Sequence, residues 1–541
     1  MSSLLPDGAR RLLRPSNIIM LLPVLGLVVT TPYLLLSPVY IDEIQWKMIN
    51  SRLWLDGGKL LYLFPACTKG FLLNVPMTWY PSRVIDSLLF ADMGDPQRLR
   101  FWGLGTFLAI VLYASWAARR LVQPKAPFVC VFGAVLAPLT LGVLPFLLVF
   151  SRPEQPIVLS LLLGCTLPFV LPSSQAGNVR SWVFVALYTF LAWTMTAAHL
   201  KAIYFLPVLL FAAFIMVRSW LPRIVLCATF GYSAVETLNI WLARTDCPES
   251  PFLMQVFHNL SLSPADLGGG LSPFIHRWVA NLLEAPNYWD RIAFQLDYQN
   301  FWLPHSSAPL SELEVAVNKT PEIAVVLGLL VVAAGIFRSL RFERMRVAWV
   351  GRPGAMAALL VLPLIALAGM QTTKNFYEAG LGAPLLGLAV MLALPGLLSG
   401  AEKFRKAGLA AVIALACVST VSQVALAARF SANLPMWFAK LSKRQMEQAD
   451  VAAALDRCRL PIGLAGSHIA MDDLAYTVLW RTREPIVMAH VSGWWATGMD
   501  LKQLVHDRNI IGFIGKCTNI PPAYQPEMVA EGRYCCSRVE Q

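Results

Sequence analysis

Apolar runs close to 20 residues long recur along most of this 541-residue chain. A helix of about 20 residues crosses the roughly 30 Å hydrocarbon core of a bilayer. Only 14% of the residues are charged, against about 25% in an ordinary soluble protein, and 57% are hydrophobic. These features predict a polytopic α-helical membrane protein and argue against a water-soluble multidomain protein.

The sequence predicts about eleven transmembrane helices. The first, over 17–36, follows three arginines and is longer than the apolar core of a cleaved signal peptide. No small-residue cleavage site follows it, so we expect a retained span. The further spans are expected near 101–118, 127–150, 156–173, 181–198, 202–217, 222–243, 321–337, 355–371, 379–399 and 408–428.

The cations indicate which side each loop faces. Alternate loops are short and dense in Lys and Arg, which places them and the N-terminus in the cytoplasm. The same clusters explain the net charge of +12, so the charge does not indicate nucleic-acid binding. The predicted domains are a transmembrane domain over 1–428, with outer loops at about 37–100 and 244–320, and an exoplasmic domain over 429–541.

The exoplasmic tail is predicted to be a small α/β domain. Strands are expected at 462–465, 485–489 and 510–514, and helices at 472–481 and 499–508. Alternating strands and helices predict a parallel sheet. The sequence has no Gly-rich phosphate loop, so we do not expect a nucleotide site in this domain.

Cysteines support the same assignment of sides. An exoplasmic compartment permits disulfides among the four tail cysteines, which are Cys458, Cys517, Cys535 and Cys536. The adjacent pair cannot easily bridge each other, so one of them is expected to bond to Cys517 or Cys458. The long outer loops add Cys67 and Cys247, and the cysteines inside the spans are expected to be small apolar fillers.

An acidic pair, Asp42-Glu43, follows the first span and begins a long outer loop rich in aromatic residues. Carboxylates at such a place can simply be solvated. A carboxylate held by a span end beneath a folded loop can instead take a proton from an acceptor hydroxyl. The pair is therefore a candidate for the base of a reaction at the outer membrane surface.

This arrangement resembles the GT-C superfamily of glycosyltransferases. The resemblance lies in the cytoplasmic N-terminus, the Asp42-Glu43 pair after the first span, the large first outer loop, about eleven spans and the exoplasmic C-terminal domain. Members include bacterial lipid A aminoarabinose and galacturonic acid transferases and protein O-mannosyltransferases. The resemblance implies a sugar donor on a polyprenyl phosphate or diphosphate, a catalytic base at Asp42 or, second, Glu43, and a place in the bacterial inner membrane.

Two short outer connections supply further candidates. Arg152 and Glu154 lie in the turn that joins the third and fourth spans. There Arg152 can bind a phosphate, and Glu154 can bind a sugar hydroxyl or a metal. The alternative is a Pro turn with an exposed salt pair. His199 and Lys201 lie between the fifth and sixth spans, where a donor phosphate would arrive, although Lys201 can also act as an anchor at the head groups.

A third cluster precedes the tenth span. Lys374 and Tyr377 offer a charge and a hydroxyl to a phosphate, and Glu378 is a further candidate for contact with substrate or a metal. Anchoring at the membrane surface is the alternative reading. The sequence implies no certain cofactor besides the lipid-linked sugar donor, and it leaves a divalent metal open.

The expected function is transfer of a sugar from a polyprenyl-phosphate donor to an acceptor hydroxyl on the periplasmic face, in cell-envelope glycan or glycolipid synthesis. Cations would stabilise the leaving phosphate while a carboxylate deprotonates the hydroxyl, and a single displacement inverts the anomeric centre. The acceptor is a glycan, a lipid or a protein. The alternative is a transporter, a flippase or an assembly subunit for lipid-linked saccharides, although transporters place charges near the bilayer midplane and these spans are nearly uncharged there.

The first prediction concerns Asp42. Asp42→Asn keeps the shape of the side chain but cannot accept a proton, so we expect turnover to fall about 10²–10⁴-fold, the usual contribution of a general base. Donor binding and protein level should not change. Parallel substitutions at Glu43 show which carboxylate is the base, and near-parental transfer by both single variants and the double variant would exclude this pair.

Overall fold

The computed structural model forms two compact units, each assembled from segments that are distant in the sequence. Unit 1 contains Met1–Ser37, Arg100–Thr237 and Leu260–Asn433, and unit 2 contains Pro38–Leu99, Leu238–Asn259 and Leu434–Gln541. The structure describes residues 19–36, 59–63, 72–74, 96–121, 127–149, 154–171, 178–217, 219–245, 261–262, 264–286, 289, 309–341, 353–372, 377–398, 402–432, 449–461, 466–472, 475, 486–488, 501–507 and 509–539.

The sequence predicts a domain boundary at residue 428, which assigns both long outer loops to the transmembrane domain. In the structure, 38–99 and 238–259 instead belong to the same unit as the tail. The reason is visible in the strands, because two segments of the first loop pair with the sheet of the tail.

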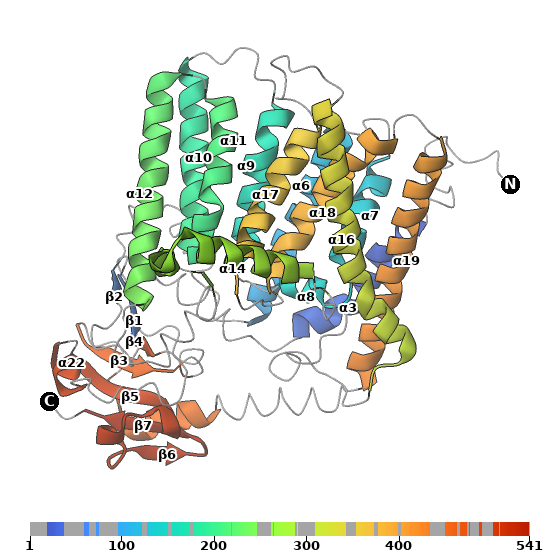
Figure 1. The fold of residues 1–541 in the computed structure, drawn as a ribbon. Helices are drawn as coiled ribbons and strands as arrows, with labels where there is room; N and C mark the ends of the chain where they lie inside the picture. Colours follow the sequence, from blue (N-terminus) through green and yellow to red (C-terminus); the bar gives the residue numbers. More distant parts are fainter. Residues whose placement is uncertain are drawn as a thin grey trace. The chain divides into compact units, whose positions relative to one another are not determined.

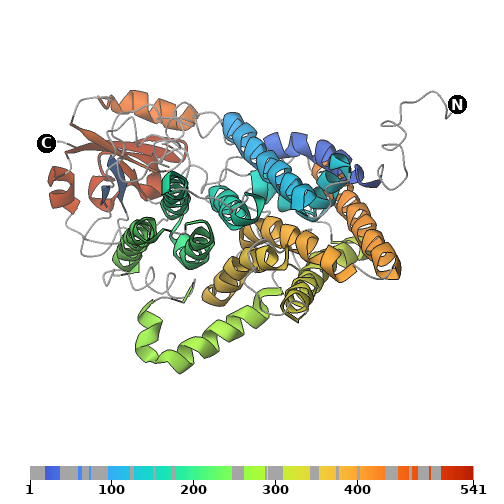
Figure 2. The same cartoon turned by 90° about the horizontal axis from the view of Figure 1, so that it is seen from above.

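Unit 1 is built from helices (Figures 1 and 2). These are α3 (Leu22–Leu36), α6 (Pro96–Leu121), α7 (Phe128–Leu139), α8 (Leu144–Val149), α9 (Glu154–Val170), α10 (Asn178–Ala198), η3 (Leu200–Tyr204), α11 (Leu206–Met216), α12 (Trp220–Thr245), η4 (Pro264–Gly269), α14 (Leu271–Glu284), α16 (Glu312–Arg341), α17 (Pro353–Met370), α18 (Tyr377–Leu398) and α19 (Glu402–Ala432). The first residues of α6 and the last of α12 belong to unit 2.

A helix lies at each position where the sequence predicts a span. The run at 127–150 is divided between α7 and α8, because Gly142 takes a left-handed φ of 50° in the turn between them. By length and composition, the described helices Arg100–Leu121, Glu312–Phe337 and Leu409–Ala432 are long and apolar enough to cross a membrane, and further apolar helices are shorter. This supports the prediction of a helical membrane protein.

Polar side chains join the helices α3, α7 and α19 inside this apolar unit. The Gln423 amide donates to the carbonyl oxygens of Thr140 and Gly142, both at 2.6 Å, and the Gly142 N–H donates to Ser422 Oγ at 3.0 Å. The methylene carbons of Gln423 also lie against Gly26 of α3. In an environment without water, such bonds satisfy carbonyl groups that the turn after α7 leaves without helical partners.

Unit 2 contains a seven-stranded sheet in the order β2-β1-β4-β3-β5-β7-β6. The elements are β1 (Lys59–Leu63), β2 (Leu72–Asn74), β3 (His468–Met471), β4 (Ile486–Met488), α22 (Leu501–Asp507), β5 (Ile510–Lys516), β6 (Val529–Glu531) and β7 (Tyr534–Arg538). The four central strands β1, β4, β3 and β5 are parallel, and β2, β7 and β6 pair antiparallel to their neighbours.

The predicted parallel sheet of the tail is confirmed in part. Strands β4 and β5 and helix α22 lie at their expected positions, and β3 pairs in parallel with both strands. Strands β3, β6 and β7 have no counterpart among the elements predicted from the sequence, and neither do β1 and β2 of the first outer loop. The expected strand at 462–465 lies outside the described residues, as does most of the expected helix at 472–481.

Two disulfides confirm the prediction for the tail. Cys458 bonds to Cys536 and Cys517 to Cys535, with Cα–Cα distances of 6.0 Å and 4.7 Å. Neighbouring residues on a strand point to opposite faces, so the adjacent cysteines of β7 reach different partners. Cys67 and Cys247 lie outside the described residues.

A second prediction follows from the contact of α6 with α8. A methyl group on Gly103 would overlap the carbonyl oxygen of Val149, whereas one on Gly105 would meet nothing within 4 Å. Inserting a methyl group into packed backbone costs about 1–3 kcal/mol, but Ala is about 1 kcal/mol better than Gly in a helix. We therefore expect Gly103→Ala to lower the midpoint of thermal unfolding in detergent and Gly105→Ala to preserve or raise it. Equal midpoints for the two variants would contradict this close packing.

Candidate functional site

The structure brings together two residues from different predicted outer connections. Glu154 is the first residue of α9, and Lys201 lies in the short helix η3. Lys201 Nζ lies 3.7 Å from Glu154 Oε1, and the two side chains are only 14% and 8% exposed. The positive end of α9 and the lysine both attract the carboxylate. The result is a largely buried ion pair at one end of the helices of unit 1.

Neighbouring residues hold each member of this pair in position. His199 has an extended backbone before η3, and its Nδ1 accepts a hydrogen bond of 3.0 Å from the Lys201 N–H. This bond caps the turn that carries Lys201. On the other side, the Gln155 amide donates to the carbonyl oxygens of Gly103, at 3.3 Å, and Leu148. The start of α9 is thereby attached to α6 and α8.

A short segment of the second outer loop pairs with the end of α17. Ser261 forms an isolated antiparallel bridge with Gln371, and the Leu262 N–H donates to the Met370 carbonyl at 2.7 Å. Helix η3 also packs directly on α17. The turn that carries Lys201 and the end of α17 therefore belong to one continuous region of unit 1.

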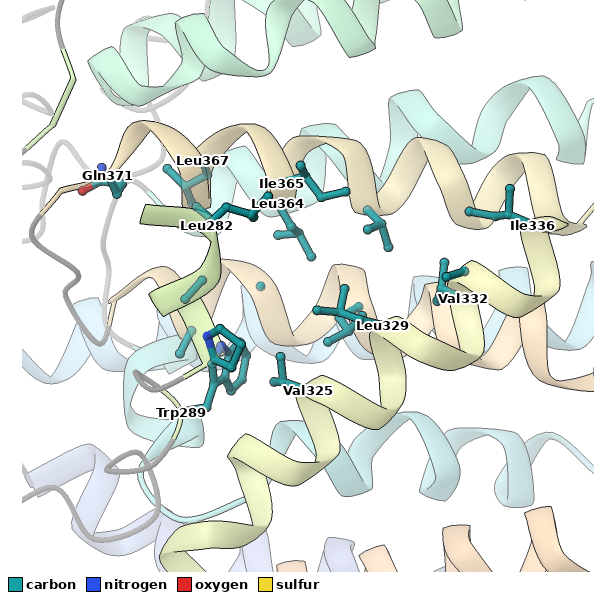
Figure 3. Close-up of a pocket in the computed structure, with 18 residues that line it drawn as sticks. Leu282, Trp289, Val325, Leu329, Val332, Ile336, Leu364, Ile365, Leu367 and Gln371 are labelled. Carbon is teal, nitrogen blue, oxygen red and sulfur yellow. The ribbon is translucent and has the colours of Figure 1, made fainter. Parts of the chain in front are cut away.

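An apolar cavity of about 410 Å³ begins at this end of α17. Figure 3 shows it running from Gln371 at one end to Ile336 at the other, between α16 and α17. Among its lining residues only Gln371 and Trp289 carry polar side-chain atoms. The lining residues are Leu282, Ala285, Pro286, Trp289, Val325, Leu329, Val332, Ala333, Ile336, Val361, Leu364, Ile365, Leu367, Ala368, Gln371, Ala379, Gly382 and Leu386. The volume lies within the range of small-molecule sites, and the lining suits a hydrocarbon chain.

The remaining predicted site residues are placed less completely. Asp42, Glu43, Arg152 and Lys374 lie outside the described residues. In the sequence, Arg152 stands two residues before Glu154, and Lys374 stands three residues after Gln371.

Helix α18 contains two further predicted residues. Tyr377 and Glu378 are its first two residues, and they precede Ala379, which lines the cavity. The parts of the third predicted cluster that the structure describes therefore adjoin the cavity in sequence.

Sequence reasoning missed the cavity and helix α14. The sequence predicts Gln371 only as the last residue of an apolar span, and its amide is the one local signal. Helix α14 has a clear amphipathic pattern, but it lies inside a loop for which no element was predicted. The cavity has no local signal, because its walls come from four separate segments of the chain.

A buried carboxylate in unit 2, that of Asp472, stabilises the sheet. Buried Asp472 follows β3, at the edge where parallel sheets often bind ligands. Its carboxylate accepts hydrogen bonds from the N–H groups of Ala475 (2.9 Å) and Lys516 (2.7 Å) and from the Asn519 amide (3.2 Å). These bonds join the ends of β3 and β5. Among the described residues of the whole chain, no three His, Cys, Asp or Glu side chains gather in a way that could hold a metal ion.

No protein-family model and no curated protein matches the sequence. Among solved structures, the chain is similar to ArnT from Cupriavidus metallidurans bound to undecaprenyl phosphate, with 12% identity, coverage of 97% of this chain and 98% of that one, and a TM-score of 0.45. It is also similar to the oligosaccharyltransferase of Archaeoglobus fulgidus tethered with an acceptor peptide, with 11% identity, coverage of 93% and 69%, and a TM-score of 0.44.

A third prediction tests the ion pair. Glu154→Gln and Lys201→Met each remove one charge of this largely buried pair, whereas the double variant removes both charges. We expect each single variant to lose about 1–3 kcal/mol of stability and the double variant to lose less than the sum of the two. Thermal unfolding of the purified protein in detergent measures this coupling.

The matched control is Lys319→Met, which breaks an ion pair with Glu322 whose side chains are 54% and 28% exposed. Exposed pairs contribute about 0–1 kcal/mol, so this variant should unfold close to the parent. Additive losses at Glu154 and Lys201 would show that the two side chains are not coupled.

Proposed function

We propose that this chain is a GT-C-type membrane glycosyltransferase, which transfers a sugar from a polyprenyl-phosphate donor to an acceptor hydroxyl on the outer face of the inner membrane. One observation carries the proposal: the short helix η3, which carries a largely buried lysine, packs on α17, and α17 also lines an apolar cavity. A lipid phosphate needs both kinds of environment, a cation for its head and an apolar channel for its chain.

The donor's position follows from these surroundings. Its isoprenoid chain would occupy the cavity between α16 and α17, and its phosphate would lie beyond Gln371, toward Lys201. A polyprenyl lipid is too apolar to leave the bilayer, so the groups that act on it must be fixed at span ends. In this arrangement Arg152, Lys374 and Tyr377 add charge and a hydroxyl around the phosphate.

The ion pair has a role in binding as well as in stability. Lys201 pairs with Glu154 at 3.7 Å, longer than a direct charge-assisted hydrogen bond. An arriving phosphate can therefore compete for the ammonium group. In this proposal Glu154 holds a sugar hydroxyl or a metal. His199 keeps the lysine in place by capping its turn.

The reaction needs one proton transfer and one displacement. Asp42, with Glu43 as the second choice, takes the proton from the acceptor hydroxyl as its oxygen attacks the anomeric carbon. The bond to the phosphate oxygen breaks with its electron pair, and the cations stabilise the phosphate that leaves. A single displacement inverts the anomeric centre.

The membrane arrangement belongs to the same proposal. It has about eleven crossings, a cytoplasmic N-terminus and an exoplasmic tail, with unit 1 as the membrane part. The two disulfides of the tail support this side, because the cytosol keeps thiols reduced.

The direct test uses the purified protein in proteoliposomes with labelled polyprenyl-phosphate sugars that differ in head group, and with envelope glycolipids as acceptors. Transfer is expected to move label to the acceptor and to release one polyprenyl phosphate for each sugar moved. Movement of the donor between leaflets without release of polyprenyl phosphate would overturn the proposal and favour a flippase.

A fourth prediction tests the cavity with two neighbouring leucines of α16. Leu329 lines the cavity, whereas Leu330 is 61% exposed on the outside of unit 1. Leu329→Trp should fill part of the cavity and lower kcat/KM for the donor by about tenfold or more, which corresponds to about 1.4 kcal/mol or more of lost binding. Leu330→Trp adds the same indole outside the cavity and should keep the parental value. Equal effects of the two variants would separate the cavity from the donor site.

A further inference from the structure

Helix α14 presents three different faces along its length. One line of side chains is apolar and exposed, with exposed fractions from 40% to 74%: Leu271, Ile275, Val279 and Leu283. The neighbouring line is exposed and mostly polar: Ser272, His276, Ala280 and Glu284. The third line is directed into unit 1 and includes Trp278, Asn281 and Leu282. An exposed apolar line beside an exposed polar line is typical of a helix at a boundary between water and lipid.

The inner face of α14 is firmly attached, so the exposed apolar line does not come from a detached helix. The Trp278 indole lies so close to Gly369 of α17 that a methyl group there would overlap it. The Asn281 amide donates to the Gly369 carbonyl at 3.0 Å, and Arg277 pairs with Asp266 of η4 at 2.7 Å. These contacts determine which line of side chains faces outward.

The direction of α14 differs from that of its neighbours. Figure 1 shows α14 running across the direction of α17 rather than along it, and Figure 2 shows it at the periphery of the helices. A helix that lies across membrane-spanning helices lies roughly in the plane of the membrane. Its contact at Gly369 is near the last residue of α17, which is an outer end in the predicted topology.

A candidate membrane span that lines the same cavity as α14 also exposes apolar side chains. The end of α14 and the residue after it contribute Leu282 and Ala285 to the cavity wall, beside Val325 and Leu329 of α16. On its outer surface α16 exposes large apolar side chains, namely Ile323, Val326, Leu327 and Leu330. Both α14 and α16 therefore expose apolar side chains on the surface of unit 1.

We propose that α14 lies in the outer interface of the bilayer, with Leu271, Ile275, Val279 and Leu283 among the lipid acyl chains and the line from Ser272 to Glu284 in water. Arg277 is engaged by Asp266, and the helix has no cluster of basic residues, so the contact depends on acyl chains and not on anionic head groups. This surface goes beyond the proposed function, because it requires neither a donor nor an acceptor.

Adjacent positions of α14 provide a matched test. Val279→Cys lies on the apolar line and Ala280→Cys on the polar line, and both parent residues are exposed. Each is introduced into protein in which the exposed free cysteines Cys227 and Cys417 are replaced by Ser, and that protein without a new cysteine sets the background. The variants are labelled with a small environment-sensitive fluorophore and reconstituted in neutral phosphatidylcholine that contains lipids with a quencher on the acyl chain.

At position 279 we expect a blue-shifted emission that the lipid quencher reduces at least twofold more than at position 280. An impermeant maleimide should react faster with Cys at 280 than at 279. Thermal unfolding confirms that both variants are folded. Equal quenching at the two positions, or an emission shift at 279 that depends on the protein-to-lipid ratio and so reports a second copy, would overturn the proposal.

The result of the α14 labelling experiment is independent of the result of the transfer assay. The labelling experiment contains no sugar donor, so a failure of the proposed glycosyl transfer leaves its result intact. Conversely, an α14 line that does not contact lipid would leave the Glu154–Lys201 pair and the cavity as they are.

Discussion

Backbone amides in a lipid bilayer must find their hydrogen bonds within the protein, and the rest of unit 1 depends on this constraint. A helix meets this constraint because it forms its backbone hydrogen bonds within one segment. Each interruption of a helix leaves backbone groups that need polar partners. The turn between α7 and α8 shows the consequence, since Gln423 and Ser422 supply bonds to Thr140 and Gly142 there. The described candidate residues Glu154 and Lys201 accordingly lie at helix ends.

The candidate site uses two such ends together. Glu154 begins α9, and Lys201 lies in the short turn before α11, so each is held by a helix end and not by a free loop. The short helix η3, which carries Lys201, packs on α17, and α17 also lines the apolar cavity. A substrate that is a phosphate at one end and a hydrocarbon at the other matches that combination better than a soluble sugar nucleotide does.

Unit 2 follows another logic, because it is stabilised by sheet pairing and covalent bonds. Strands β1 and β2 come from the first outer loop, which in the sequence also contains Asp42 and Glu43. Strand β2 pairs with β1, and β1 pairs in parallel with β4 of the tail. The two disulfides attach β7 to the helix at 449–458 and to the residue after β5. Loop closure of this kind reduces the freedom of the unfolded chain.

The sequence by itself determined where the candidate membrane spans of unit 1 lie, because the length of an apolar run reports directly on burial along one segment. It also identified strands β4 and β5, the disulfide cysteines, and Glu154 and Lys201 as candidates at helix ends. Only the tertiary structure decided that Glu154 meets Lys201, that Ser261 reaches Gln371, that four segments enclose a cavity, and that β1 joins β4. These contacts join residues far apart in the chain, and they depend on side-chain packing between segments, which no local periodicity records.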